Sequence, residues 1–237
     1  MMKLKKRTLI HTIHRDKKDL FFQSKVTTMI FKGVNMVLGE NILGIKCRNV
    51  VLASSNEEKV KKLEQAGIPC FCFPPLVKEN AIVFDPEITG REMALKFSEM
   101  CAADVGNVYP NFYIISTEQS IECDGKVFKR PDCLDDVLSD LKQLNGKKYT
   151  LYTATTIYKN FKKRWQELEE THLTRKLLTP EEIEAFAMEY GPSMFGVLGS
   201  VRLDEFPDIV EEKNINPEII DALPVKKIVH FFKMLRK

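Results

Sequence analysis

The most regular arrangement of apolar and polar positions lies at Val50–Gly67. Four consecutive apolar residues, Val50–Ala53, predict a short buried strand, and the polar residues Ser54–Asn56 predict a turn. Apolar side chains then recur at helical spacing until Gly67, a residue type that often follows the C-terminus of a helix. A side-chain oxygen from the turn can cap this helix, because it satisfies one of the free N–H groups of the first turn.

The remaining chain alternates between the two periodicities. Runs rich in β-branched and aromatic residues predict strands, and apolar residues three and four positions apart predict amphipathic helices. The predicted strands are Ile68–Val77, Phe112–Ile115, Val127–Pro131 and Lys147–Tyr158, and the predicted helices are Gly90–Ala103, Asp132–Gly146, Leu178–Tyr190 and Val225–Leu235. Asp124 and Gly125 predict a hairpin turn. This mixture of strands and helices predicts an α/β fold.

The turn at Ser54–Asn56 also has the form of an anion site. The free N–H groups and the positive end of the helix dipole point toward whatever lies beyond the turn. Lys59, one turn into the helix, can place a positive charge beside a phosphate. An ordinary capped strand–helix unit has the same local sequence, so the geometry alone does not separate the two interpretations.

Charge is unevenly distributed along the 237 residues. The formal net charge is +3, but residues 1–35 contain nine Lys or Arg and two Asp, so the remainder is slightly acidic. We therefore expect residues 1–44 to form a disordered basic extension and residues 45–237 to form the folded domain. A mitochondrial presequence is an alternative, whereas nucleic-acid binding is not expected because no aromatic residues are interleaved with the basic ones.

The lengths of the apolar runs and the spacing of the cysteines bear on the cellular location of the protein. No stretch approaches the roughly 18–20 apolar residues that span a bilayer, so we expect no membrane partner. The six cysteines are scattered and include no C-x-x-C pair, which predicts reduced thiols in a cytoplasmic protein.

Two motifs resemble nucleoside triphosphate pyrophosphatases. Ser54, Asn56 and Lys59 are similar to the phosphate-contacting ser-x-asn-x-x-lys motif of the inosine triphosphate pyrophosphatase family. The wider segment resembles the opening of the Maf family, a sister family. Maf proteins usually have Ser-Pro-Arg-Arg where this chain has Asn56–Lys59, so the arginine pair is missing although one cation remains. The resemblance implies phosphate binding by Ser54, Ser55 and Asn56.

The second motif follows the predicted strand Phe112–Ile115. Glu118, Asp124-Gly125 and Arg130-Pro131 resemble the Maf sequence ala-asp-thr, asp-gly and lys-pro. Glu118 then occupies the position at which Maf proteins have an essential Asp, and Arg130 occupies the position of their Lys. The resemblance implies that Glu118 binds metal or activates water, that Lys59 and Arg130 complete the catalytic set, and that Glu58 is available as a second metal ligand.

The loop after Tyr190 differs from the corresponding loop of Maf proteins. In Maf proteins a Lys of this loop contacts phosphate and an aromatic-gly-ile-gln element lines the base pocket. Here no Lys remains, Leu198 replaces the Gln, and Phe195-Gly196-Val197 resembles the aromatic element. The implied base pocket is therefore Phe195 and Gly196. Glu169–His172 resemble a strand of animal Maf domains, of the kind found in acetylserotonin methyltransferase-like proteins.

The resemblance implies a fold and an activity. The fold is a curved mixed sheet flanked by helices, in two lobes with a central cleft. The activity is hydrolysis of a nucleoside triphosphate, of the dTTP or UTP type or with a modified base, to the monophosphate and pyrophosphate with Mg²⁺ or Mn²⁺. Each missing cation is typically worth about 2.7–4 kcal/mol. The alternative is therefore a catalytically degenerate Maf-like protein that binds nucleotide or a partner, and a homodimer is left open.

Overall fold

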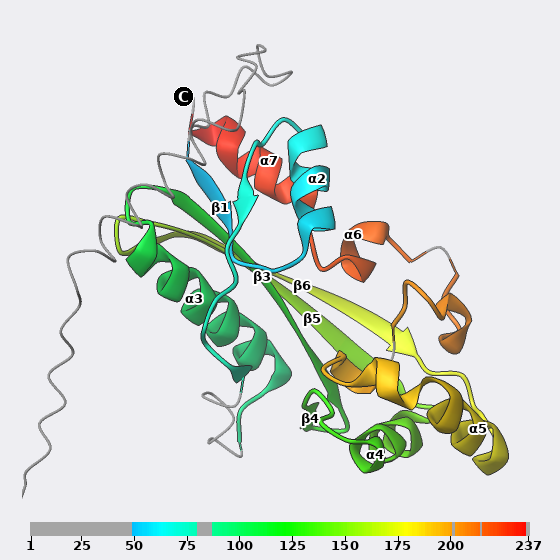
Figure 1. The fold of residues 1–237 in the computed structure, drawn as a ribbon. Helices are drawn as coiled ribbons and strands as arrows, with labels where there is room; N and C mark the ends of the chain where they lie inside the picture. The colour runs from blue at the N-terminus through cyan, green and yellow to red at the C-terminus, as the bar shows by residue number, and fades with distance from the viewer. Residues whose placement is uncertain (1–48, 80–86, 201, 214, 236–237) are drawn as a thin grey trace, which may run out of the picture. The chain divides into compact units, whose positions relative to one another are not determined.

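A mixed β-sheet forms the centre of the fold, and helices cover both of its faces (Figure 1). The computed structural model describes residues 49–79, 87–200, 202–213 and 215–235, which belong to one structural unit, Asn41–Lys237. The predicted basic extension, residues 1–44, lies outside the described residues. Within the described residues the sheet has six strands in the order β2-β1-β3-β5-β6, with β4 paired to β3.

The elements follow the predicted alternation of strands and helices. The strands are β1 (Val50–Leu52), β2 (Phe71–Cys72), β3 (Tyr113–Cys123), β4 (Lys126–Phe128), β5 (Lys148–Lys159) and β6 (Lys162–Thr174). The α-helices are α2 (Glu57–Gln65), α3 (Gly90–Val108), α4 (Leu134–Leu144), α5 (Pro180–Tyr190), α6 (Pro217–Ile220) and α7 (Val225–Met234). Short 3₁₀ helices are η2 (Gly191–Met194), η3 (Leu198–Ser200) and η4 (Pro207–Ile209). The predicted α/β fold with a mixed sheet flanked by helices is therefore confirmed.

The first strand–turn–helix unit forms as the sequence predicts. β1 is buried on both faces, and α2 begins where the Asn56 side chain accepts a hydrogen bond from the Glu58 N–H at 2.9 Å. Gly67 ends the unit with φ +84°, a backbone conformation that glycine adopts without strain. The predicted strand Ile68–Val77 is wrong in length, because only β2 pairs with β1. Pro74 and Pro75 follow it and have no N–H to donate to a ladder.

β3 is the strand that joins the two halves of the sheet. Its first residues pair in parallel with β1, and its last residues pair with β4 in the predicted hairpin. The prediction that the strand ends at Ile115 is wrong, because the polar residues Ser116–Ser120 continue the antiparallel ladder with β5. On the opposite edge of β3, pairing with β1 stops at Ile115 and pairing with β4 starts at Ile121. Among the described residues no strand covers Ser116–Ser120 on that edge.

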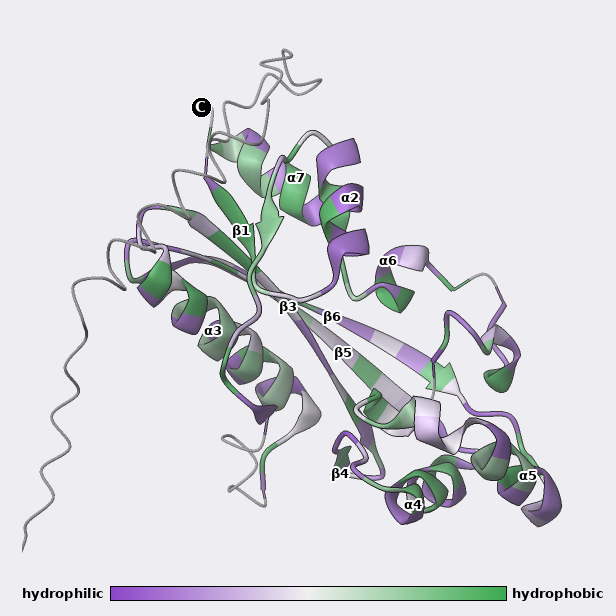
Figure 2. Cartoon of the chain, viewed as in Figure 1, coloured by the Kyte–Doolittle hydropathy of each residue, from purple (hydrophilic) through white to green (hydrophobic). Residues whose placement is uncertain are grey.

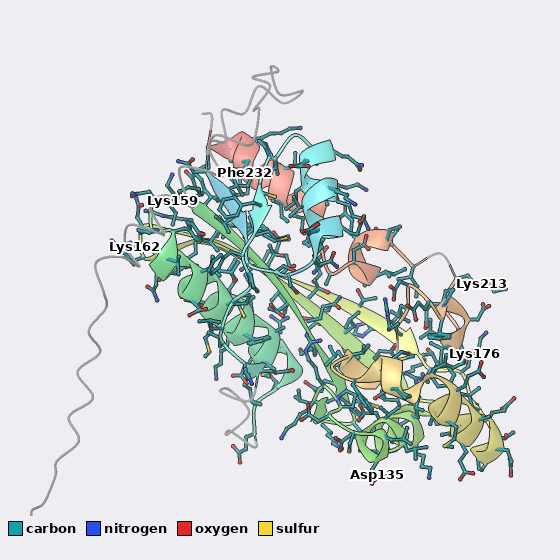
Figure 3. All side chains as sticks on the ribbon, viewed as in Figure 1. Asp135, Lys159, Lys162, Lys176, Lys213 and Phe232 are labelled. Atoms are coloured by element: carbon teal, nitrogen blue, oxygen red, sulfur yellow. The ribbon has the colours of Figure 1, made fainter. Side chains whose placement is uncertain are left out.

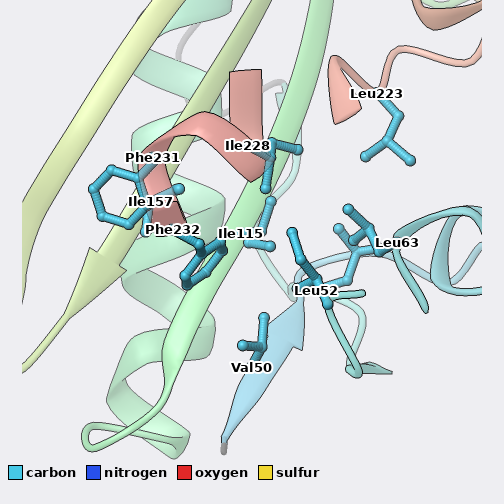
Figure 4. Packing of buried hydrophobic residues seen from close by; sticks show 10 residues of the cluster. Val50, Leu52, Leu63, Ile115, Ile157, Leu223, Ile228, Phe231 and Phe232 are labelled. Atoms are coloured by element: carbon cyan, nitrogen blue, oxygen red, sulfur yellow. The ribbon is translucent and has the colours of Figure 1, made fainter. Parts of the chain in front are cut away.

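Successive residues of β1 supply two different cores. Val50 and Leu52 face α2 and α7, whereas Val51 and Ala53 face α3, as expected for side chains that alternate along a strand. The core on the α7 side contains ten buried residues, which Figure 4 shows in close view: Val50, Leu52, Leu63, Ile68, Ile115, Ile157, Leu223, Ile228, Phe231 and Phe232. Burial on both faces explains why β1 is a continuous apolar run rather than an alternating one.

Separate cores form at the other end of the long strands. Ile121, Leu144 and Leu173 belong to a cluster that continues into η3 and η4. α4 and α5 pack against each other through a further cluster that includes Leu141 and Ile183. Figure 2 shows the resulting two-sided helices, with hydrophobic residues on one side and hydrophilic residues on the other. The predicted division into two lobes therefore has a physical basis in separate hydrophobic cores.

Charged side chains lie on the outside of these layers. Figure 3 labels Lys159 and Lys162 at the turn between β5 and β6, and Lys176 and Lys213 near the opposite end of that strand pair. The five cysteines in the described part of the chain are free thiols. No helix within the described ranges is long and apolar enough to cross a bilayer.

The core beneath α7 provides a test of the fold. Phe232 is 1% exposed and packs edge-on against Tyr113 and Phe231. We expect Phe232→Ala to lower the free energy of unfolding by about 3–5 kcal/mol, because it leaves a cavity in a packed core. Met234→Ala, at a half-exposed position of the same helix, is the control and should cost much less. Urea unfolding measures both, and equal costs would contradict the assigned packing.

Candidate active site

The uncovered edge of β3 is where the predicted catalytic residues meet. Glu118 lies in the middle of the uncovered stretch, Lys59 reaches it from α2, and Arg130 reaches it from just beyond β4. β1 and β4 both pair with this edge of β3, one on each side of the gap. The chain that leaves each of these strands therefore passes the same short stretch of β3, and the gap between them brings the three residues together.

Arg130 connects two carboxylates. Its Nε lies 3.1 Å from Oε2 of Glu79, and its Nη2 lies 3.9 Å from Oε2 of Glu118. Its Nη1 donates a hydrogen bond of 3.1 Å to the carbonyl of Gly196. The Glu79 and Glu118 side chains are only 10% and 16% exposed, so their pairing with Arg130 takes place largely away from water. One guanidinium therefore holds two acids and a loop of the other lobe.

Burial shifts the proton affinity of both acids. Burial raises the pKa of Glu118, and the positive charges of Arg130 and Lys59 oppose that shift. Burial also raises the pKa of Glu79 against the charge of Arg130. Cys101, a buried residue of α3, contacts the Glu118 carboxyl through its thiol. A buried carboxylate next to a cation has the properties of a general base.

Lys59 is the second cation of the cluster. Its Nζ donates to Oγ1 of Thr117 at 3.3 Å and to the carbonyl of Ala222 at 3.2 Å. Burial lowers the pKa of Lys59, while the charges of Glu118 and Asp221 act in the opposite direction. The ammonium therefore faces the site from a partly desolvated position, where its charge acts more strongly than it would in water.

Glu79 is the site residue that the sequence did not identify. It lies in the polar segment after β2, which has no periodicity and belongs to none of the motifs. An isolated Glu in such a segment is most simply interpreted as a solvated loop residue. Only the tertiary contact with Arg130 shows that it is buried and faces the same guanidinium as Glu118.

The predicted phosphate-binding turn has a defined structure. Oγ of Ser54 accepts a hydrogen bond from the Asn56 N–H at 3.1 Å, and Asn56 caps α2. Ser55 and Asn56 are exposed, and Ser54 is partly exposed. The turn therefore presents the N-terminus of α2 to solvent, and phosphate binding by these three residues stays a prediction.

Glu58, the predicted second metal ligand, lines the hollow beside the cluster. It is exposed on α2, and its carboxylate forms an ion pair with Lys61 at 2.5 Å. The negative charge of Glu79, which is also largely buried, acts on the Glu118 carboxyl and raises its pKa. Glu79 therefore offers a second largely buried carboxylate beside Glu118, and metal binding by Glu118 and Glu58 stays a prediction.

Glu118 and Glu79 suit a metal ion that takes its remaining ligands from the substrate and water. Among the described residues no group of three His, Cys, Asp or Glu side chains could hold a metal ion. A complete cage for a structural ion is therefore absent from this part of the chain. Mg²⁺ in nucleotide sites is bound by one or two carboxylates and completed by substrate phosphates and water. Glu118 and Glu79 fit that arrangement.

A hollow of about 380 Å³ opens beside this cluster. One wall comes from α2 and residues 219–222, another from the segment that contains η3, and the floor comes from the strands. Four of the predicted site side chains line it: Asn56, Glu58, Lys59 and Arg130. This volume is within the range of small-ligand sites, and the hollow corresponds to the expected cleft between the lobes.

The predicted base pocket is only partly in place. Gly196 lines the hollow and has φ +73°, which glycine tolerates. Phe195 is 44% exposed and is not among the lining residues. The sheet contributes other lining side chains: Gln119 and Ile121 of β3, Tyr149 and Leu151 of β5, and Arg175 just after β6.

Fold and site together define an α/β protein with a cation-lined hollow beside two buried carboxylates. Residues 49–235 match the family model described as Maf-like protein. The match covers most of the chain, so the chain belongs to the Maf-like protein family.

Curated relatives of the chain are named nucleoside triphosphate pyrophosphatase. The protein of Nitrobacter hamburgensis is 26% identical over 156 residues, which is 65% of this chain and 77% of the relative. That of Pelagibacter ubique is 22% identical over 198 residues, 80% of this chain and 99% of the relative. Among solved structures, a HAM1 protein from Coxiella burnetii is similar with a TM-score of 0.41 and 10% identity, over 79% of this chain and 97% of that one. These relatives are bacterial, so the similarity to animal Maf domains stays a prediction.

The raised pKa of Glu118 gives a test by stability. Below the usual glutamate pKa of 4.5 the carboxyl is protonated in both the folded and unfolded states. As the pH rises through the raised pKa of the folded state, the buried group must ionise and stability is lost. We therefore expect Glu118→Gln to be more stable than the native protein at pH 7.5, with a difference that vanishes near pH 4.5.

Urea unfolding across this pH range makes the measurement. Glu99→Gln is the control, because the Glu99 side chain is 41% exposed and its ion pair with Lys163 lies at the surface. A Glu118→Gln protein that is less stable at pH 7.5 than at pH 4.5, relative to the native protein, would contradict the dominance of burial.

Proposed function

We propose that this protein hydrolyses a nucleoside triphosphate to the monophosphate and pyrophosphate. The single observation that carries the proposal is the meeting of Glu118, Arg130 and Lys59 at one uncovered sheet edge beside a hollow. Membership of the Maf-like family adds support, because curated relatives are named for this activity. The proposed substrate is of the dTTP or UTP type or carries a modified base.

The two cations provide charge neutralisation in this scheme. Arg130 and Lys59 line the hollow and bring positive charge to the triphosphate. The N-terminus of α2, with Ser54, Ser55 and Asn56, offers backbone N–H groups and the positive end of the helix dipole to a phosphate. Phosphoryl transfer depends mainly on such positioning and electrostatic stabilisation.

Glu118 is the proposed general base. Water attacks the α-phosphorus, the bond from that phosphorus to the α–β bridging oxygen breaks, and its electron pair leaves on pyrophosphate. The proton of the water passes to the Glu118 carboxylate. Burial raises the pKa of Glu118 toward the working pH, which favours proton transfer. Cys101, in contact with the same carboxyl, fixes its position.

Glu118 and Glu79 are the proposed holders of the divalent ion, either Mg²⁺ or Mn²⁺. Such an ion supplies charge neutralisation and polarisation of the phosphoryl oxygens when it is bound. The ion pair between Arg130 and Glu79 keeps that second carboxylate at the site. A cytoplasmic location and a homodimer stay predictions that accompany this proposal.

One assay distinguishes nucleotide hydrolysis from the alternative function, nucleotide binding without hydrolysis. Pyrophosphate release is measured from dTTP, UTP and ATP with Mg²⁺ or Mn²⁺, and we expect turnover of at least one of these nucleotides. Lys59→Met should lower kcat by about 10²–10³-fold, the usual cost of losing one group aimed at developing charge. Glu118→Gln should abolish most turnover while the protein stays folded.

Lys61→Met is the matched control, because Lys61 is an exposed lysine of the same helix that does not line the hollow. It should retain native turnover. Absence of turnover with every nucleotide, or equal turnover by Glu118→Gln and the native protein, would leave a degenerate binding protein as the function.

A further inference from the structure

Residues 217–222 form a short strap along one wall of the hollow. The strap comprises α6 and the two residues after it, and residues 219–222 line the hollow. α6 is a single turn of helix beside α2 (Figure 1), and it begins where the Asn216 side chain accepts a hydrogen bond from the Glu218 N–H at 3.1 Å. The strap ends at Leu223, which is fully buried in the core beneath α7. The core therefore anchors its C-terminal end.

The strap supplies the acceptors that two lysines of α2 meet. Lys59 donates from Nζ to the carbonyl of Ala222 at 3.2 Å, and Lys62 forms an ion pair with Asp221. Lys59 and Lys62 are three positions apart, so they lie on the same face of α2, and both line the hollow. Two consecutive residues of the strap thus hold the two ammonium groups that α2 presents to a ligand.

The backbone of Ala222 is strained. Its φ is +48°, in the left-handed region, which is unfavourable for a residue with a Cβ. A backbone of this kind persists only where the surrounding contacts enforce it. Here the contacts are the hydrogen bond from Lys59 to the Ala222 carbonyl and that from the Leu223 N–H to the carbonyl of Glu218 at 2.9 Å. Release of the strap would relieve this strain.

Few other contacts hold the strap in place. Nε2 of Gln119, in β3, donates to the carbonyl of Ile219 at 2.8 Å and ties the strap to the sheet. No residue of α6 itself is buried. A segment held by polar contacts, without a fully buried side chain of its own, belongs to the parts of a protein that open at low cost in free energy.

A triphosphate in the hollow competes with these contacts. Phosphate oxygens make strong charge-assisted hydrogen bonds to ammonium groups, and a triphosphate carries more negative charge than one carboxylate. A triphosphate that reaches Lys59 and Lys62 also brings its charge close to Asp221, and like charges at short distance repel each other. Both effects favour the exchange of the acceptors on the strap for phosphate oxygens.

We propose that residues 217–222 are an autoinhibitory strap, which occupies Lys59 and Lys62 in the free protein and is displaced by the phosphates of the substrate. The Asp221 carboxylate and the Ala222 carbonyl take the places of phosphate oxygens until a ligand arrives. Displacement frees both ammonium groups and opens this wall of the hollow. The inference rests on the proposed function only in taking a polyphosphate as the ligand.

Hydrogen exchange of the full chain tests the displacement directly. The exchange of the amides of residues 218–223 is measured by mass spectrometry with and without saturating inorganic tripolyphosphate, in the absence of divalent ions. A ligand normally slows exchange where it binds. Displacement should instead speed exchange of these amides about 10-fold, the effect of losing one hydrogen bond to a charged group. Slower or unchanged exchange, or no binding of tripolyphosphate, would overturn the inference.

Asp221→Asn gives an independent readout, because it removes the charge that holds Lys62 and keeps the shape of the side chain. Calorimetric titration should show tripolyphosphate binding about 10-fold more tightly than to the native protein. Asp204→Asn is the matched control, because Asp204 also lines the hollow and pairs with an arginine, Arg202, at 3.1 Å. It makes the same change in net charge and should alter the affinity by about twofold or less.

Two outcomes of the titration contradict the strap. An equal gain in both variants would assign the effect to net charge alone. Weaker binding by Asp221→Asn would make the strap a support of the binding site rather than a competitor of the ligand. If Asp221→Asn does not fold, the exchange data on the native protein decide.

Neither measurement requires hydrolysis of a nucleotide. If tripolyphosphate displaces the strap and no nucleotide is cleaved, the inference stands while the proposed function fails. If nucleotides are cleaved and tripolyphosphate slows exchange in residues 218–223, the proposed function stands and the strap inference fails.

Discussion

The site depends on one partly exposed arginine between two largely buried acids. Arg130 lies 3.1 Å from Glu79 and 3.9 Å from Glu118, and both carboxylates are largely removed from water. Removing two carboxylates from water costs free energy that pairing with one partly exposed guanidinium only partly offsets, which agrees with the raised pKa of both acids. The contacts of Arg130 with Glu79 and Glu118 therefore do little to stabilise the fold. They keep two carboxylates together at a position where a second cation could bind them.

The fold explains why these groups meet. β1 and β4 pair with the two ends of one edge of β3 and leave Ser116–Ser120 uncovered between them. The same long strands carry two separate cores, one beneath α7 and one beside α4. Ile121, Tyr149, Leu151 and Leu198 of the second core form part of the wall of the hollow. Arg130 also donates to the Gly196 carbonyl, which connects the acid cluster to the loop across the hollow.

Local structure was largely predictable from the sequence, and tertiary contacts were not. The cap of α2 by Asn56 and the hairpin at Asp124-Gly125 follow from short-range chemistry, and both are present. Glu118, Lys59 and Arg130 could be found because they stand in motifs. Glu79 and Arg175 could not, because the burial of each comes from segments distant in the chain. Glu58 as second metal ligand stays a prediction: it lines the hollow, and its neighbour Lys61 pairs with it locally.

The most direct test is a crystal structure with Mn²⁺ and an α,β-imido dTTP, with the ion located by its anomalous scattering. The account predicts manganese between the carboxylates of Glu118 and Glu79 and the phosphates, with the triphosphate against Lys59 and Arg130. Manganese bound elsewhere, or a triphosphate that makes no contact with either cation, would contradict it.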